Sequence, residues 1–219
     1  MSGAHTHWVI HADDHCIVVH KPSGLPSVPG RVLLDCAASR VQAQWPDAKV
    51  VHRLDMDTSG LLLFARGIDA QRRLSRAFEQ RQVEKRYVAL VAGQPSESSG
   101  TIDLPLIVDW PRRPRQIVDL ERGKRAVTHW NVLETLAPSD SPHPTPAVVC
   151  RVELSPVTGR SHQLRVHMAA LGHPILGDPL YAGAEVQSLA PRLCLHATAL
   201  AFDHPAHGTR LCLTCAPPF

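Results

Sequence analysis

Several features that would assign a protein to a special class are missing from this sequence. No apolar run approaches the roughly 20 residues that a membrane helix needs. The first ten residues lack the apolar centre of a secretory signal, because His5 and His7 interrupt them. There is also no internal repeat and no low-complexity tract. These absences argue against membrane, secreted and repetitive proteins. They favour the reducing cytoplasm, where the six scattered cysteines would stay as free thiols.

Positive charge is modest and comes mostly from one residue type. The net charge is only +3 at pH 7, so the whole molecule is not a polycation. Lysine contributes 4 of the 23 basic side chains and arginine contributes 19. Arginine suits bidentate phosphate contacts and stacking, but a GC-rich genome would also favour arginine codons. Composition therefore leaves a nucleic-acid partner open.

The 219 residues are 44% hydrophobic and 20% charged, enough to bury a core as one large domain or two small ones. Apolar runs and alternation predict strands at 16–20, 61–65, 87–91, 126–136, 147–154, 193–202 and 209–215. The continuous run 61–65 is typical of a strand covered on both faces. Residues 94–100 and the proline-rich 137–146 are expected to be surface connections.

Helical periodicity predicts three helices, at 33–45, 69–81 and 162–171. Leu34 is expected on the apolar face of the first helix and Leu171 on that of the third. Asp69 and Ser161 are expected to cap the second and third helices, with Gly172 as a left-handed residue at the end of the third. Many strands with a few irregularly placed helices indicate an α+β fold with a largely antiparallel sheet.

Two segments far apart in the chain carry the residues best suited to chemistry. Residues 52–60 place Asp55 two positions after Arg53, and residues 159–181 hold arginines, histidines and a glycine-rich tail. An acid on one segment and bases on the other suggest a paired carboxylate available for nucleophilic chemistry.

These segments resemble the RluA family of RNA pseudouridine synthases. The similarity extends from Asp13-Asp14-His15 and Lys21-Pro22-Ser23-Gly24-Leu25 to the last strand. Within the family, residues 27–31 and 109–114 resemble the subgroup with dual specificity for 23S rRNA and tRNA. The resemblance implies a mixed, mainly antiparallel sheet in two halves, with flanking helices and a central RNA cleft. It also implies an N-terminal extension, 1–12, followed by one catalytic domain, 13–219, without an S4 module.

The resemblance also assigns catalytic roles. The family breaks the N1–C1′ bond of a uridine, rotates the uracil and rejoins it through C5, using neither cofactor nor metal. Asp55 matches the catalytic aspartate, Arg165 the arginine that pairs with it, and Tyr87 the tyrosine that stacks on the uracil. Each residue alone has a structural alternative: Asp55 could cap a turn, Arg165 could lie on a helix surface, and Tyr87 could be a core residue.

RNA contacts are expected from arginines outside this trio. Arg53 matches the residue that helps to displace the target nucleotide from its stack, as base flipping requires; a salt bridge to Asp57 is its alternative. The remaining candidates for RNA binding are Arg112, Arg113, Arg115, Arg160 and His162. Charge runs such as 112–125 are usually solvated faces, but Trp110 and prolines beside them suit a loop that holds an RNA hairpin.

A zinc site is the competing interpretation. Cys212 and Cys215 have C-x-x-C spacing, with Cys194 and His196 nearby in the sequence. Positions i and i+3 of a strand face opposite sides, so we expect no metal there.

The sequence therefore predicts a cytoplasmic, monomeric RNA pseudouridine synthase that needs no obligate protein partner. It would act on a 23S rRNA hairpin and the tRNA anticodon loop. The alternatives are a synthase for a different rRNA site or for tRNA only, and a non-catalytic RNA-binding or RNA-folding module.

Overall fold

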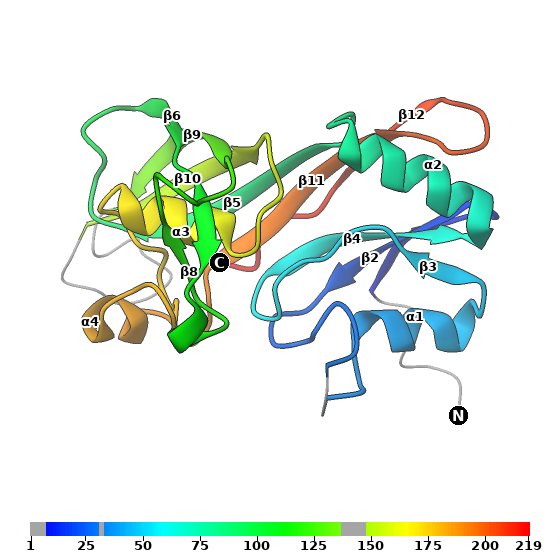
Figure 1. The fold of residues 1–219 in the computed structure, drawn as a ribbon, viewed down its shortest axis with the longest axis horizontal. Coiled ribbons are helices and arrows are strands. Elements are labelled where there is room, and N and C mark those ends of the chain that lie inside the picture. The colour runs from blue at the N-terminus through cyan, green and yellow to red at the C-terminus, as the bar shows by residue number, and fades with distance from the viewer. Residues whose placement is uncertain (1–7, 31–32, 137–147) are drawn as a thin grey trace. The chain divides into compact units, whose positions relative to one another are not determined.

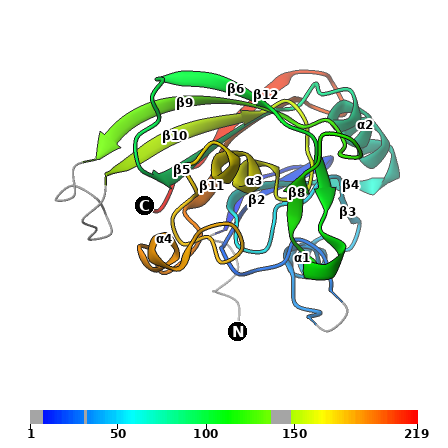
Figure 2. The same cartoon turned by 60° about the vertical axis from the view of Figure 1, so that its left-hand side comes forward.

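The computed structural model describes residues 8–30, 33–136 and 148–219 (Figures 1 and 2). The proline-rich connection at 137–146, Arg31 and the first seven residues lie outside this range. The chain divides into two compact units. The first comprises Met1–Lys85 and Ala197–Pro217, and the second comprises Arg86–His196 and Pro218–Phe219. Neither unit has a helix long and apolar enough to cross a membrane within the described residues.

The first unit is a sheet with a helix on each face. Its strands are β1 (Val9–Ala12), β2 (Cys16–Lys21), β3 (Ala48–Val50), β4 (Ser59–Arg66), β11 (Leu195–Asp203, from Ala197 onward) and β12 (Arg210–Thr214). The order is β1-β2-β4-β11-β12, with β3 also paired to β4. Helices α1 (Ala37–Gln44) and α2 (Gly67–Glu79) cover opposite faces (Figures 1 and 2).

Strand β4 is the centre of the first unit. Leu61 and Leu63 pack in one cluster with Leu74 of α2, while Leu62 and Phe64 alternate to the other face, and all are buried. This confirms the prediction of a strand covered on both faces. Gly60 has φ +113°, and a Cβ there would lie 2.3 Å from the backbone oxygen of Ala197. Strands β4 and β11 therefore approach too closely for any side chain at this position.

The second unit is a four-stranded antiparallel sheet with a short hairpin beside it. The sheet strands are β5 (Glu84–Ala92, from Arg86 onward), β6 (Ser99–Asp103), β9 (Val127–Leu136) and β10 (Val149–Pro156), in the order β5-β10-β9-β6. Strands β7 (Leu106–Val108) and β8 (Gln116–Val118) pair around the 3₁₀ turn η1 (Trp110–Arg112). The helices are α3 (Gln163–Ala170) and α4 (Ala184–Ser188).

Helix α3 packs its apolar side chains on this sheet. Leu164 and Met168 share a buried cluster with Leu90, Val152 and Leu154 of β5 and β10. Figure 2 shows α3 against one face of these strands. The α+β class with mainly antiparallel strands is thus confirmed, and α3, which carries Arg165, is fixed to the sheet by its core contacts.

Capping chemistry shifts the helix ends from their predicted positions. Helix α1 begins at Ala37, not Leu33, because Cys36 and Ser39 form a reciprocal capping box. Leu34 lies before the helix and is 72% exposed, so its predicted place on the apolar face is wrong. Helix α2 begins two residues before Asp69, whose carboxylate lies in the first turn and makes no cap hydrogen bond.

Helix α3 also differs at both ends. His162, with φ 54°, occupies the N-cap position that was predicted for Ser161, and no side chain caps the helix. Leu171 is 37% exposed rather than part of the apolar stripe. Gly172 is left-handed, as predicted. Strands of three or four residues, such as β1, β3, β7 and β8, were not predicted, because so few residues show no clear alternation.

Candidate active site

The predicted catalytic aspartate lies in a loop of the first unit. Asp55 is half-buried in the segment between β3 and β4, and Arg53, two residues earlier, is exposed. Ser27 holds the residue before Asp55 through two hydrogen bonds, because its hydroxyl donates to Leu54 O at 2.7 Å and accepts from Leu54 N at 3.0 Å. The loop position of the carboxylate is therefore set by backbone hydrogen bonds.

Lys21 supplies the second anchor of this loop. Its side chain is fully buried, and its Nζ donates to the carbonyl oxygens of Pro22 at 2.9 Å, Leu25 at 2.7 Å and Met56 at 2.8 Å. Gly24 N also donates to Met56 O at 2.9 Å. An ammonium has three donors. Lys21 thus ties the loop that follows β2 to the residue directly after Asp55.

Ser23 adds a third link between the same two loops. Its hydroxyl donates to Asp57 O at 2.7 Å. With the bonds to Leu54 and Met56, three backbone positions around Asp55 are fixed by the segment 21–27. The Lys-Pro-Ser-Gly-Leu motif therefore supports the loop that carries Asp55.

His52 lies at the start of the Asp55 loop, and its neutral ring accepts a hydrogen bond. Its Nε2 accepts from Leu63 N at 2.9 Å, and its ring stacks on Phe78 at 4.5 Å between centroids. Loss of hydration, and secondarily the charge of Lys85, lower the pKa of His52 to about 3. The imidazole is therefore uncharged at neutral pH and anchors the loop to β4.

Arg165 lies in the second unit and is held by a buried carboxylate. Its Nε is 2.8 Å from Asp178 Oδ2 and its Nη2 is 2.7 Å from Asp178 Oδ1, and both side chains are almost fully buried. This bidentate pair uses two of the five guanidinium donors. The expected solvent-facing alternative for Arg165 is wrong. Its predicted pairing with Asp55, a residue of the first unit, stays a prediction.

Tyr87 lies on β5 in register with Leu154 of β10. It is half-buried and packs against the main core cluster of the second unit. Its predicted stacking on uracil stays a prediction.

The predicted RNA-binding residues of the second unit gather near η1 and the start of α3. Trp110 is 64% exposed, and the guanidinium carbon of Arg113 lies 4.5 Å from its ring centroid. Arg112 is exposed and its Nε lies 2.7 Å from Asp109 Oδ2. Arg115 lies with its guanidinium carbon 5.5 Å from the ring centroid of Tyr181. The stacked, exposed pair of Trp110 and Arg113 suits a flat base or a phosphate.

The two remaining candidates flank the N-terminus of α3. Arg160 is exposed, and its Nε donates to Arg125 O at 3.2 Å. His162 Nδ1 lies 2.7 Å from the hydroxyl of Tyr181. Arg115 and His162 therefore meet at one side chain, whereas Arg53 lies in the first unit.

Two groups of side chains have the residue types of metal ligands. Cys212 lies in β12 and is exposed, whereas Cys215 follows the strand and is partly buried against the core, so the two thiols differ in their surroundings. His11, Asp13 and Cys16 have ligand atoms within 4.8 Å of one another. Asp13 already accepts two backbone hydrogen bonds on Oδ1 and lies 2.7 Å and 3.1 Å, through Oδ2, from His11 and His204. These contacts are typical of a hydrogen-bonded turn stabilised by an aspartate.

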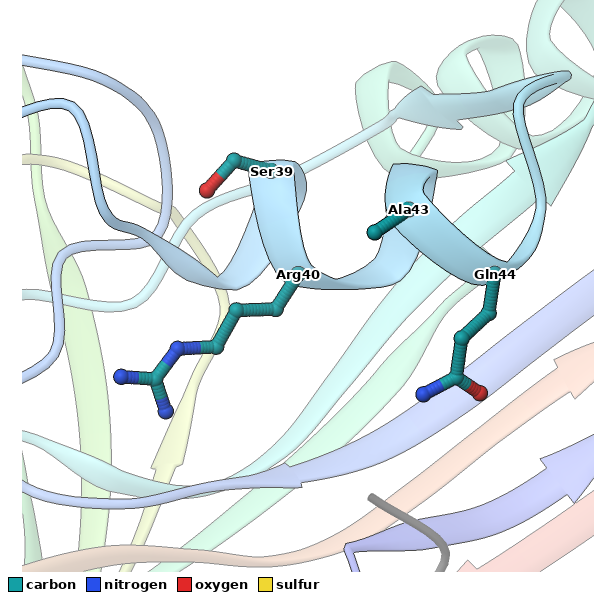
Figure 3. Close-up of a pocket in the computed structure, with 4 residues that line it drawn as sticks. All are labelled: Ser39, Arg40, Ala43 and Gln44. Carbon is teal, nitrogen blue, oxygen red and sulfur yellow. The ribbon is translucent and has the colours of Figure 1, made fainter. Parts of the chain in front are cut away.

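A shallow hollow beside α1 offers little chemistry. Figure 3 shows its lining of Ser39, Arg40, Ala43 and Gln44, all from one helix. Arg40 is paired through Nε and Nη2 with Asp35 at 2.8 and 2.7 Å. Among the residues that the structure describes, this lining includes neither a carboxylate nor an aromatic ring. The residues suited to glycosidic chemistry remain those around Asp55 and Arg165.

Comparison with known families decides the class. A family model described as RNA pseudouridylate synthase matches residues 15–170. The chain belongs to the RNA pseudouridylate synthase family. The family assignment made from the sequence motifs is therefore confirmed, and with it the enzyme class.

Curated relatives carry the same similarity over nearly the whole chain. The dual-specificity RNA pseudouridine synthase RluA of Salmonella typhi is 52% identical over 205 residues, which cover 93% of this chain and 90% of the relative. The RluA proteins of Escherichia coli K12 and Pasteurella multocida are 51% and 49% identical, covering 93% and 96% of this chain and 90% and 93% of theirs.

Solved structures confirm the pseudouridine synthase fold. Human RNA pseudouridylate synthase domain containing 1 has a TM-score of 0.79 at 28% identity, covering 98% of this chain and 86% of that one. Human RNA pseudouridylate synthase domain containing 4 has a TM-score of 0.75 at 26% identity, covering 98% and 90%.

Four residues that contact the Asp55 loop, Arg165 or His162 were not singled out from the sequence: Lys21, Ser27, Asp178 and Tyr181. All four lie inside segments that carried the resemblance, so the motif contained the signal. Their contacts join residues far apart in sequence, and no local pattern shows such contacts.

Proposed function

We propose that this chain converts uridine to pseudouridine at sites in both 23S rRNA and tRNA, with Asp55 as the catalytic carboxylate. Support comes from identities near 50%, over more than nine tenths of the chain, to dual-specificity synthases. The observation that carries the proposal is the Asp55 loop, whose backbone is anchored on both sides of the carboxylate by Lys21 and Ser27.

In the reaction, the N1–C1′ bond breaks and a C5–C1′ bond forms. The C5 proton leaves and N1 gains a proton, so atoms and charge balance. An ionised Asp55 serves this chemistry either by attacking C1′ or by deprotonating a sugar intermediate. Both routes require a carboxylate fixed close to C1′. A loop held through its backbone provides that position.

Arg165 is proposed to keep Asp55 ionised. Its guanidinium is oriented by Asp178 through Nε and Nη2. A guanidinium with five donors can bind a second carboxylate while it keeps the first. A cation at about 3–4 Å favours the charged form of a carboxylate when a base excludes water from the site.

Tyr87 and the exposed arginines are proposed to handle the RNA. The Tyr87 ring would stack on the flipped uracil, an interaction worth about 1–3 kcal/mol. Arg53, exposed beside Asp55, would fill the space that the base leaves. Arg112, Arg113, Arg115, Arg160 and His162 would bind phosphates and loop bases, so binding should weaken steeply with salt.

The proposed catalytic segment is 13–219, acting as a monomer in the cytoplasm without an added cofactor. Light scattering of purified protein tests the monomer. Tritium release from C5-labelled transcripts tests the reaction: we expect release from both a 23S rRNA hairpin and a tRNA anticodon stem-loop. Release from one RNA alone would show single specificity. No release from either, with RNA binding intact, would show a non-catalytic RNA-binding module.

A further inference from the structure

The turn that follows the buried Asp178 fixes Tyr181 to the Arg165 ion pair. Asp178 Oδ1, which accepts from Arg165 Nη2 at 2.7 Å, also accepts from Leu180 N at 2.8 Å and Tyr181 N at 3.1 Å. One carboxylate therefore holds both the guanidinium and the backbone of the tyrosine.

The Tyr181 ring returns to the same guanidinium. The Cζ of Arg165 lies 5.1 Å from the ring centroid, and the Cζ of Arg115 lies 5.5 Å from it. Both distances are within the range of cation–π contacts. A ring against Arg165 limits rotation of its guanidinium, whose orientation decides whether a second carboxylate can bind.

The hydroxyl of Tyr181 reaches two further elements. Gln116 N, at the start of β8, donates to it at 2.8 Å. His162 Nδ1, at the left-handed N-cap of α3, lies 2.7 Å away, with the two rings at 81°. Since the amide of Gln116 uses an oxygen lone pair, the phenolic hydrogen can be donated to a neutral His162. The hydroxyl thus joins the hairpin that carries Arg112–Arg115 to the start of α3.

We propose that Tyr181 is a positioning residue for the pseudouridine reaction: its ring orients Arg165, and its hydroxyl orients His162 and the β8 end of the hairpin toward the RNA. This inference rests on the proposed function. The ring and the hydroxyl of Tyr181 then have different roles. The ring acts on the chemical step through Arg165, and the hydroxyl acts on RNA binding.

The alternative is a tyrosine that merely closes the 177–181 turn. Such a residue would contribute to folding only. Its replacement would lower the folded fraction, and activity would fall in proportion to that fraction. The distinction requires variants that remove the hydroxyl alone or the whole ring.

The test compares Tyr181→Phe, Tyr181→Leu and wild type by kinetics of tritium release. Thr101→Val is the matched control, because it removes a 2.8 Å hydrogen bond between Thr101 and His129 in the same unit, outside this network. For Tyr181→Phe we expect KM for RNA to rise about 5- to 10-fold, because one or two hydrogen bonds are lost. The value of kcat should stay within about 3-fold of wild type. For Tyr181→Leu we expect kcat also to fall about 10- to 100-fold.

A second readout follows His162 itself. Its imidazole signals, assigned with His162→Gln, should change in chemical shift in Tyr181→Phe and not in Thr101→Val, because the removed hydroxyl lies 2.7 Å from Nδ1. The proposal is overturned if Tyr181→Phe and Tyr181→Leu show the same kcat and KM as wild type. It is equally overturned if both variants lose activity only in proportion to their folded fraction, or if the His162 signals do not change. An inactive wild type in this assay would instead refute the proposed function.

Discussion

The Asp55 loop and the Arg165 helix fix their side chains in opposite ways. The carboxylate of Asp55 is positioned through its neighbours' backbone, by Lys21 and Ser27. Arg165 is positioned through the guanidinium itself, by a bidentate bond to Asp178. Backbone hydrogen bonds fix where the Asp55 loop lies. The bidentate bond gives the guanidinium of Arg165 one orientation and uses two of its donors.

The Arg165 side of this comparison should show the larger stability effect. Replacing Asp178→Asn removes the charge that Asp178 supplies to a buried guanidinium and should lower the free energy of unfolding by about 3–5 kcal/mol. Urea unfolding of the full chain measures it. Asp103→Asn is the control, because Asp103 pairs with Arg125 on the surface, and its removal should leave the midpoint unchanged. A loss below about 1 kcal/mol for Asp178→Asn would contradict a structural role for the pair.

Lys21→Met tests the anchor of the Asp55 loop. Three carbonyl oxygens lose a charged donor, so the unfolding free energy should fall by about 3 kcal/mol. Turnover should fall more than RNA affinity, because the loop that carries Asp55 loosens. The exposed Lys124→Met serves as the control in the unfolding assay. Wild-type turnover in Lys21→Met would mean that the loop holds its shape without this ammonium.

The buried His52 in the Asp55 loop should make the free energy of unfolding depend on pH. The pKa of His52 is about 3 in the folded protein and near 6.5 in an unfolded chain. The unfolded state therefore binds more protons between these values, so stability is kept above pH 6.5 and lost as the pH falls toward 3. Between pH 7 and pH 5 the loss should be about 2 kcal/mol. His52→Gln should flatten the unfolding free energy over this range; an unchanged slope would contradict the neutral, desolvated imidazole.

Ser27→Ala should give the smallest effect. It removes the hydroxyl that donates to and accepts from Leu54, at a cost of about 1 kcal/mol in unfolding free energy. Because Lys21 still holds Met56, kcat should drop only a few-fold. Ser27→Thr, which keeps the hydroxyl, is the matched variant and should recover part of the loss. A larger loss in Ser27→Ala than in Lys21→Met would reverse the assigned order of the two anchors.

Sequence reasoning found the elements whose pattern is local. The run Leu61–Leu62–Leu63 predicts a strand covered on both faces, because successive side chains point to opposite faces and all of them are apolar. Leu34 was misplaced because the capping box of Cys36 and Ser39 starts helix α1 at Ala37. Leu171 was misplaced because helix α3 ends at Ala170, so Leu171 occupies the C-cap position and is 37% exposed. Periodicity shows which face of a helix is apolar, and the capping residues decide where the helix begins and ends.

The candidate site was predicted through its motifs and not through its contacts. Asp55 and Arg165 stand in segments recognisable by residue type and order, which identify the chemistry. Lys21 was not expected inside the protein, because lysine is rarely buried without partners, and its three carbonyl partners are invisible in a linear sequence. The partnership of Arg165 with Asp178 spans 13 positions and a turn, so no helical spacing shows it.

The most direct test of the central claim is the single-turnover rate of Asp55→Asn with saturating RNA. The account predicts tritium release at the level of protein-free RNA, with RNA affinity within about 3-fold of wild type, because the amide keeps the shape of the carboxylate and loses its charge. Release within tenfold of the wild-type rate, or a loss of affinity as large as the loss of rate, would contradict a chemical role for this carboxylate.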